Sequence, residues 1–469
     1  MHKLDVIEIL KEIEENYAVN SIKVNDIQVW PFLRSKYLAI IADRNLNINH
    51  SKKNNLYPII KSIRNFSYGL LNLPKKMNYL VFSDTMELRL IRGKYVNKLA
   101  YDIIEMLGKD RTLVIENPYY QNHKKISKLK MKNVISLDFF NILSIIYPFK
   151  LKLEIENEKI LKDINSKYEI TFNYSASIKK FFYYNMIFNI LFKIKKPKAI
   201  FISDYYNLPH QAAIYAARKL GIKTVELQHG IINSKHSAYN IFSEVDRSFF
   251  PEYLFVFGDY YKDFFNINDY FIDKKNIFSV GNMYIDYINN SYLPSDKDIE
   301  LFNNFREKYK KIVAISSQIG IEDRLIDFLI KSSSLSSDIL FIFVPRNFNK
   351  DYSNYNFPSN ILILDNLDVY QIIKESDFHS SVNSTCAIEA PALGVPNILI
   401  NISNESKKYY FDILTNPDVT KFVDTPEEFV KIIQTWSPKP KEKIKQLHEG
   451  FYAKNRKESL KINLHKINS

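Results

Sequence analysis

The sequence predicts an α/β protein with two Rossmann-like domains, each built on a doubly wound parallel sheet. Short runs that are wholly apolar recur along the chain, as in Tyr79–Phe82 (YLVF) and Ile312–Ile315 (IVAI). Such runs are typical of strands that are buried on both faces of a parallel sheet. Segments with helical periodicity separate them, which favours strand–helix–strand units. The alternation lapses near residues 289–299 and then restarts, so we expect two sheets.

The first domain is expected at residues 75–245. Its strands are the apolar runs Tyr79–Phe82, Thr112–Ile115, Asn133–Leu137, Ala199–Ile202 and Thr224–Leu227. Helices are expected at 99–107, 151–168, 176–195 and 208–219, and Gly221 ends the last of them. Residues 1–74 are expected to form a helical extension, with Pro31 in the first turn of its second helix and an irregular stretch at 45–77.

The second domain is expected at residues 305–435. Its strands are Ile312–Ile315, Ile339–Val344, Ile361–Leu364, Phe378–Val382 and Asn397–Ile400, with helices at 321–333 and 368–375. Residues 246–304 are expected to connect the domains through two strands, Tyr253–Phe257 and Ile277–Val280. Residues 436–469 are expected to form a C-terminal helix that can return to brace the first domain. The expected architecture is therefore two facing parallel-sheet domains with helical extensions at both ends.

The single cysteine, Cys386, excludes a disulfide framework and a cysteine-based metal site, and it suits a reducing compartment. The N-terminal residues are charged and amphipathic and lack the apolar core of a signal peptide, so we expect a cytoplasmic protein. The aromatic run Phe181–Phe192 has 12 residues, too few to span a bilayer. Two alternatives stay open for this run: an interfacial helix and a buried core helix.

The net charge of +13 is unevenly distributed. Residues 121–200 hold 16 lysines and 6 acidic residues, a net of +10. This basic segment fits contact with the inner-membrane surface, and the alternative is a solvated lysine-rich face. No signature of a nucleic-acid-binding module accompanies it, so we expect no nucleic-acid partner.

Polar residues that directly follow strands are the candidates for a site, because ligands of open α/β sheets bind beyond the carboxyl ends of the strands. His229 lies between a strand end and Gly230 and titrates near neutral pH, so we expect a general base. Asp204 and Asp84 are alternative bases, although an Asp in such a turn is commonly a cap. His210, at a helix start, is expected to pack or cap.

Acceptor contacts are also expected in the first domain. The candidates are Asp84, Arg89, Arg92, Gln228 and Gly230. Either arginine suits a carboxylate or phosphate of the acceptor, and the alternative is a surface ion pair.

In the second domain, the stretch Ser380–Pro396 (SSVNSTCAIEAPALGVP) passes from a strand through a hydroxyl-bearing turn into a short helix. This arrangement predicts an anion site for a nucleotide phosphate, and the alternative is an ordinary capped turn. Arg346 follows a buried strand and suits a phosphate, and Glu389 suits a ribose diol. The expected donor-binding residues are Gln318, Arg346, Ser381, Asn383, Ser384, Thr385 and Glu389.

Several motifs are missing from the sequence. There is no GxGxxG after a strand, no GxxxxGK[ST] and no GxSxG, which argues against dinucleotide oxidoreductases, P-loop NTPases and α/β-hydrolases. No acidic triplet stands at a strand end, so we expect no catalytic metal. No cofactor is expected either.

Four stretches resemble glycosyltransferases of the GT-B fold, over most of residues 75–465. They are FISDYYNLPHQAAIYAARKLGIKTVELQHGI, YLFVFGDYYKDFF with IFSVGNMYID, VAISSQ, and HSSVNSTCAIEAPALGVP. The chain is most similar to transferases of bacterial capsule and O-antigen synthesis, which include sialyl- and polyol-phosphate transferases, and VWPFLR near the N-terminus is similar to them too. Such relatives often carry Lys-x-His-Pro after the second strand of the C-terminal domain. Here Phe343-Val344-Pro345-Arg346 departs from that pattern, and Arg346 would replace the histidine.

The resemblance implies a metal-independent transferase that moves a sugar from a nucleotide-sugar donor to a surface polysaccharide or a lipid-linked glycan. The second domain would hold the donor through Ser384, Thr385 and Glu389. The first domain would hold the acceptor, and His229 or Asp204 would deprotonate its hydroxyl, with inversion at the sugar. Three alternatives stay open: a polyol-phosphate transferase, a sugar-nucleotide epimerase, and an inactive scaffold of a polysaccharide-assembly complex.

Overall fold

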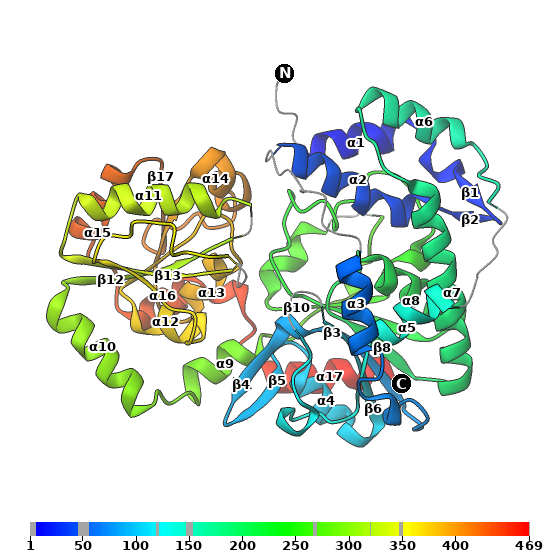
Figure 1. The fold of residues 1–469 in the computed structure, drawn as a ribbon, viewed down its shortest axis with the longest axis horizontal. Coiled ribbons are helices and arrows are strands. Elements are labelled where there is room, and N and C mark those ends of the chain that lie inside the picture. The colour runs from blue at the N-terminus through cyan, green and yellow to red at the C-terminus, as the bar shows by residue number, and fades with distance from the viewer. Residues whose placement is uncertain are drawn as a thin grey trace. The chain divides into compact units, whose positions relative to one another are not determined.

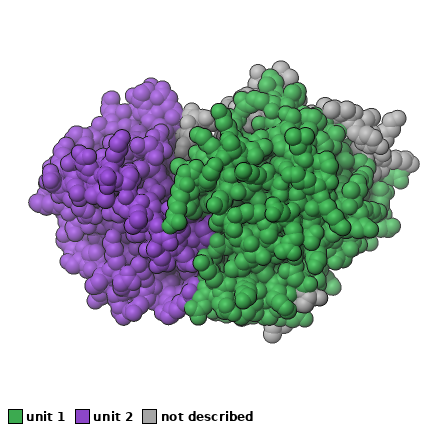
Figure 2. Space-filling view, turned by 90° about the horizontal axis from the view of Figure 1, so that it is seen from below, with its two compact units in different colours: residues 1–281, 455–469 green, residues 282–454 purple. Residues whose placement is uncertain are grey.

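A computed structural model describes residues 6–45, 56–118, 122–146, 153–265, 270–318, 320–346 and 350–468. The chain divides into two compact units, drawn as a ribbon in Figure 1 and coloured separately in Figure 2. Unit 1 comprises Met1–Gly281 and Asn455–Ser469, and unit 2 comprises Asn282–Lys454. Each unit has its own parallel sheet, so the predicted fold class of two doubly wound Rossmann-like domains is confirmed.

The sheet of unit 1 has seven parallel strands in the order β11-β10-β9-β8-β3-β6-β7. Their bounds are β3 (Tyr79–Asp84), β6 (Thr112–Asn117), β7 (Val134–Ser136), β8 (Ala199–Ile202), β9 (Lys223–Leu227), β10 (Tyr253–Val256) and β11 (Ile277–Ser279). In chain order this is the doubly wound order with one added edge strand, and it reverses direction between β3 and β8. Ligands of such sheets bind at this switch point.

Helices and two hairpins complete unit 1. The helices are α1 (Val6–Asn16), α2 (Trp30–Asn45), α3 (Leu56–Asn65), α4 (Tyr101–Leu107), α5 (Asp138–Ile146), α6 (Glu158–Lys167), α7 (Tyr174–Lys195), α8 (Leu208–Lys219) and α17 (Arg456–Asn468). The hairpins pair β1 (Lys23–Val24) with β2 (Ile27–Gln28), and β4 (Leu88–Ile91) with β5 (Lys94–Asn97). As predicted, Pro31 lies in the first turn of α2.

Two predictions about unit 1 are corrected by the structure. Strands β10 and β11 belong to the first sheet and not to a connection. They escaped assignment because the described residues between them form short 3-10 turns and no α-helix. Within the stretch predicted to be irregular, Leu56–Asn65 is helical, while residues 46–55 lie outside the described residues.

Of the two alternatives for the run Phe181–Phe192, the buried core helix is the one observed. The run belongs to α7 and is largely buried, with Phe181 stacked on Phe32 at 3.9 Å between ring centroids. Ile190, near its end, is exposed.

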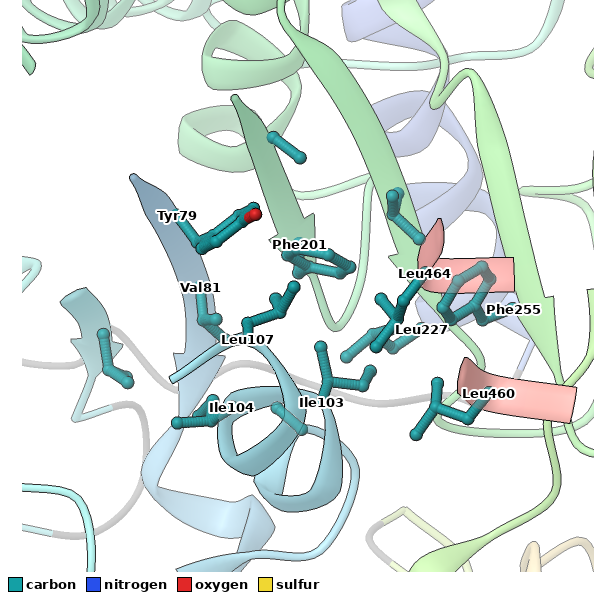
Figure 3. Packing of buried hydrophobic residues seen from close by; sticks show 14 of the residues in the cluster. Tyr79, Val81, Ile103, Ile104, Leu107, Phe201, Leu227, Phe255, Leu460 and Leu464 are labelled. Carbon is teal, nitrogen blue, oxygen red and sulfur yellow. The ribbon is translucent and has the colours of Figure 1, made fainter. Parts of the chain in front are cut away.

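The C-terminal residues split between the units. Helix α16 (Lys441–Leu447) belongs to unit 2, whereas α17 packs on the sheet of unit 1, so the expectation that the end of the chain braces the first domain is confirmed. Figure 3 shows Leu460 and Leu464 of α17 among the apolar side chains of the sheet and of α4. An ion pair between Arg456 and Asp102 ties α17 to α4 as well.

The sheet of unit 2 has six parallel strands in the order β14-β13-β12-β15-β16-β17. Their bounds are β12 (Lys311–Ser316), β13 (Ile339–Val344), β14 (Ile361–Ile363), β15 (Phe378–Ser380), β16 (Asn397–Ile400) and β17 (Thr420–Val423). The other helices of this unit are α9 (Met283–Asn290), α10 (Asp296–Lys308), α11 (Glu322–Ser334), α12 (Val369–Glu375), α13 (Cys386–Ala392), α14 (Glu405–Tyr410) and α15 (Pro426–Thr435). The strand order again reverses once, between β12 and β15.

We expect Leu464→Ala to lower the free energy of unfolding by roughly 2–4 kcal/mol, because it leaves a cavity under α17. Leu464 is buried in the core cluster of unit 1. Chemical denaturation measures the change. The control is Ile462→Ala on the same helix, where the side chain is 47% exposed. An equal loss in both variants would contradict a bracing role for the buried face of α17.

Candidate active site

The switch point of unit 1 places two carboxylates at the same level on neighbouring strands. Strands β3 and β8 pair in parallel with Phe82 opposite Ile202. Asp84 comes two residues after Phe82, and Asp204 comes two residues after Ile202. Across the other neighbour of β3, Asp84 lies opposite Asn117, whose Nδ2 donates to Asp84 Oδ2 at 3.3 Å. Two of the predicted acidic residues are therefore brought together.

Asp204 is the ionised member of this pair. Its Oδ1 lies 2.9 Å from Nδ1 of His210 and also accepts a hydrogen bond from Asn207. Burial raises the pKa of Asp204. The hydrogen bond from His210 and the charges of His210 and His229 lower it by more, so the net pKa lies below its ordinary value. Burial lowers the pKa of His210, and the contacts with Asp204 overcome this and raise it. The two side chains form an ion pair.

Asp84 is the neutral member. Burial and the negative charges of Asp204 and Glu87 raise its pKa to about 7. Among the described residues, its Oδ1 is buried and has no hydrogen-bond partner. Like charges this close cannot both ionise readily, which pushes their pKa values apart. With a pKa of about 7, Asp84 is protonated in a large fraction of molecules near neutral pH, and this protonated form can donate a hydrogen bond.

His229 follows β9 and is partly exposed. Its Nε2 lies 2.9 Å from the hydroxyl of Tyr206, and burial holds the pKa of that hydroxyl well above its ordinary value. Nδ1 of His229 is buried and has no partner in the described part of the chain. One ring nitrogen thus contacts Tyr206, and the other has no protein partner among the described residues, so its role as a general base stays a prediction.

A buried acid fixes the loop that follows His229. Glu226, within β9, is fully buried, and its Oε1 accepts hydrogen bonds from the backbone of Tyr205 at 3.2 Å and the hydroxyl of Tyr239 at 2.9 Å. Burial raises the pKa of Glu226 well above its ordinary value, which favours the protonated carboxyl. His236, in the same loop, is kept neutral because burial and the charge of His229 lower its pKa to about 3.

The N-terminal helices hold this loop from the other side. Glu14 of α1 accepts hydrogen bonds from Nε of Arg34 at 2.9 Å and from the indole of Trp30 at 3.0 Å. The guanidinium of Arg34 also donates to the carbonyls of Ser237 and Asn240. The motif VWPFLR is therefore a brace for the loop beside His229, and removing one partner of such a buried pair is strongly destabilising.

Local contacts are observed for two of the remaining predicted acceptor residues. The side-chain amide of Gln228 donates to the carbonyl of Gly230 at 2.8 Å and accepts from the backbone of Phe257 at 2.7 Å. Arg89, on β4, donates to the carbonyls of Met86 and Leu88. Arg92 is exposed in the β4–β5 turn with a positive φ of 48°. Contact of these residues with an acceptor stays a prediction.

In unit 2, a neutral polar network joins the strands at the switch point. The hydroxyl of Ser316 donates to Nε2 of His379 at 2.8 Å, and Nδ1 of His379 donates to Asn397 at 2.7 Å. Burial lowers the pKa of His379 to about 4, so the ring is neutral. Asn397 in turn donates to the carbonyl of Ala387 in α13 at 2.6 Å. This network fixes the ends of β12 and β15 and the start of α13.

The hydroxyl-bearing turn follows β15 as predicted. Ser381 accepts from the backbone of Ser384 at 3.2 Å, and Ser384 accepts from the backbone of Cys386 at 3.3 Å. Thr385 is partly exposed and makes no side-chain capping bond. Gly394 ends α13 with a φ of +81°, and a Cβ there would meet the backbone of Lys441 at 2.9 Å, so this position requires glycine.

Two amides of this edge have buried oxygens without a protein partner among the described residues: Oε1 of Gln318, after β12, and Oδ1 of Asn383, after β15. Both were predicted as donor-binding residues. Glu389 is nearly buried and accepts from the hydroxyl of Tyr370 at 2.8 Å, so its contact with a ribose remains a prediction. Arg346, two residues after β13, is exposed, and its contact with a phosphate stays a prediction.

Sequence reasoning missed three contributors to the site. His210 was expected to pack or cap, whereas it pairs with Asp204. Glu226 lay inside a predicted strand, and a charged residue in an otherwise buried run was the available signal. Tyr206 comes two residues after Asp204, and its hydroxyl lies 2.9 Å from Nε2 of His229. Groups of His, Cys, Asp and Glu that could hold a metal ion are absent from the described residues. No helix in the described residues combines the length and hydropathy needed to cross a bilayer.

Comparison with known proteins shows the fold. No protein-family model matches the sequence. No curated protein matches it either. Among solved structures, the glycosyltransferase of kitacinnamycin is similar, with a TM-score of 0.50 and 8% identity over 84% of this chain and 100% of that one. UDP-GlcNAc 2-epimerase from Neisseria meningitidis bound to UDP-GlcNAc is also similar, with a TM-score of 0.48 and 13% identity over 83% of this chain and 99% of that one. The calicheamicin glycosyltransferase CalG4 has a TM-score of 0.48 and 10% identity over 83% of this chain and 98% of that one.

We expect Asp84→Asn to change how stability depends on pH. The pKa of Asp84 is about 7 in the folded protein and 3.8 ordinarily, so the folded state holds this proton more tightly. The wild-type free energy of unfolding therefore carries a contribution that is lost as pH rises from about 4 to about 7. The variant lacks this loss. Its free energy of unfolding, relative to that of wild type, should therefore rise by at least about 1 kcal/mol between pH 5 and pH 8.

Chemical denaturation across this pH range measures the difference. The control is Asp110→Asn, at an exposed aspartate of the same unit. A difference between wild type and Asp84→Asn that does not vary with pH would show that Asp84 is ionised throughout.

Proposed function

We propose that the protein is a glycosyltransferase that uses a nucleotide sugar as donor. The carrying observation is that both switch points present polar atoms without protein partners among the described residues: Asp84 Oδ1 and His229 Nδ1 in unit 1, and Gln318 Oε1 and Asn383 Oδ1 in unit 2. Buried polar atoms are nearly always satisfied, so unpaired ones at a ligand-binding edge support a bound polar molecule. The fold shared with the kitacinnamycin glycosyltransferase agrees with this proposal.

Unit 2 is proposed to bind the donor. Its edge offers amide and hydroxyl groups, which suit the neutral hydrogen-bonding groups of a nucleotide and sugar. Gln318, Asn383 and Thr385 are the proposed contacts. Arg346 is the proposed partner of the diphosphate, because an exposed guanidinium after β13 can bind two phosphate oxygens at once. No metal or cofactor is part of this proposal.

Unit 1 is proposed to bind and activate the acceptor. Nδ1 of His229 takes the proton of the acceptor hydroxyl as its oxygen attacks the anomeric carbon. The bond from that carbon to the phosphate oxygen breaks, and the nucleotide leaves with the electron pair, which inverts the sugar. The negative charge of Asp204 stabilises the imidazolium that forms. Protonated Asp84 donates a hydrogen bond that orients the acceptor.

The acceptor is proposed to be a growing surface polysaccharide or a lipid-linked glycan, in the cytoplasm at the membrane. This finer statement rests on the resemblance of VELQHG and HSSVNSTCAIEAPALGVP to capsule and O-antigen transferases.

Incubation with a panel of nucleotide sugars, with and without glycan acceptors, tests the proposal. A transferase releases nucleotide in proportion to glycan extended. An epimerase converts the free nucleotide sugar with no acceptor present, and a polyol-phosphate transferase turns over only a nucleotide-activated polyol. A scaffold turns over nothing. Any of the last three outcomes overturns the proposed activity.

We expect His229→Ala to lower kcat about 100-fold or more, because it removes the base. Asp84→Asn should keep most activity at pH 6.5, since an amide also donates a hydrogen bond, whereas Asp84→Ala should not. Wild-type activity should fall as pH rises through about 7, where Asp84 loses its proton. This fall should be absent in Asp84→Asn. If Asp84→Asn showed the same pH profile as the wild type, the proposal that protonated Asp84 donates a hydrogen bond to the acceptor would be contradicted.

A further inference from the structure

Three segments of unit 1 that contain no acidic residue meet at the amino edge of its sheet. They are residues 70–78 before β3, residues 130–133 before β7 and residues 190–198 before β8. Nζ of the buried Lys195 donates to the carbonyls of Leu73 and Lys75, which joins the end of α7 to the segment before β3. Asn72 donates to the carbonyls of Lys132 and Val134, which joins that segment to the start of β7. Regions far apart in sequence thus form one surface.

This amino-edge surface is strongly basic. Its exposed cations are Lys75, Lys76, Lys130, Lys132, Lys193, Lys196 and Lys198. On the α4 side it is bordered by Glu105, which forms an ion pair with Lys109, and by Asp110. On the β9 side it is bordered by Glu252, which pairs with Arg218 and Lys223. The exposed lysines of the surface outnumber these acidic groups, so the surface is positively charged and attracts anions.

Large apolar side chains protrude from the same surface. Leu71, in a 3-10 turn next to Leu73, is 91% exposed, and Ile194, adjacent to Lys195, is 72% exposed. Ile190, one turn earlier on α7, is 51% exposed. A surface that only binds polyanions gains nothing from exposed leucine and isoleucine. Apolar residues rimmed by lysines are instead typical of surfaces that enter the headgroup region of an anionic bilayer.

We propose that this amino-edge surface docks unit 1 on a membrane that contains anionic lipid, with Leu71 and Ile194 inserted among the lipids and the surrounding lysines on the headgroups. The surface lies at the edge of the sheet opposite Asp84, Asp204 and His229. Membrane binding therefore leaves the candidate active site free. The inference does not depend on the proposed function, since vesicle binding needs no substrate.

Co-sedimentation of the full-length protein with vesicles tests this proposal, using phosphatidylcholine alone and phosphatidylcholine mixed with phosphatidylglycerol. Binding should require the anionic lipid and weaken with salt. The triple variant Lys75→Gln, Lys193→Gln, Lys196→Gln should weaken binding roughly tenfold or more. The matched control neutralises three exposed lysines of unit 2, Lys297, Lys431 and Lys439, and should bind nearly as well as wild type.

A charge-neutral change separates bilayer docking from general attraction to polyanions. Leu71→Ser with Ile194→Ser should weaken vesicle binding roughly fivefold or more and leave binding to heparin unchanged. Leu293→Ser, at an 85% exposed leucine of unit 2, is its control. Vesicle binding by Leu71→Ser/Ile194→Ser equal to that of wild type would overturn the proposal, and so would equal losses in the lysine variant and its control. Unchanged thermal melting confirms that each variant is folded.

Discussion

The like-charge constraint between Asp84 and Asp204 organises the site of unit 1. The register of two buried parallel strands places both carboxylates at one level, next to each other in a poorly solvated environment. One of them must be paired or neutral. His210 pairs with Asp204, and Asn207 both caps α8 and contacts the same carboxylate. Asp84, left without a cation, keeps its proton to about pH 7. The backbone topology thereby creates an acid and an anion side by side.

Unit 2 uses the same topology with different chemistry. Its switch point is held together by the neutral groups Ser316, His379 and Asn397. The acids that follow β12, Glu322 and Asp323, both pair with Lys350. Neutral amides and hydroxyls favour binding of a nucleotide without repelling its phosphates. A charged, proton-exchanging edge and a neutral, hydrogen-bonding edge are complementary requirements of glycosyl transfer. This division of chemistry supports the assignment of acceptor and donor halves.

Much of the fold could be predicted because the strands of a parallel sheet are buried on both faces and so appear in the sequence as continuous apolar runs, such as Ala199–Ile202. Strands β10 and β11 could not be assigned to their sheet, since the described residues between them form no α-helix and strand pairing is not local. In the site, strand-end positions identified Asp84, Asp204 and His229, and they also pointed to Gln318 and Asn383. The pairing of His210 with Asp204 depends on side-chain direction at the start of α8, which apolar patterning does not record. The surface at the amino edge likewise emerges only when distant segments meet.

Nucleotide binding tests the central claim most directly. Thermal melting of the full-length protein is measured with CMP, CDP, UDP and GDP. We predict that one of these nucleotides raises the melting temperature, that Gln318→Ala with Asn383→Ala removes the increase, and that Asp204→Asn retains it. No increase with any nucleotide, or an increase that survives in the unit 2 variant and disappears in Asp204→Asn, would contradict a donor site in unit 2.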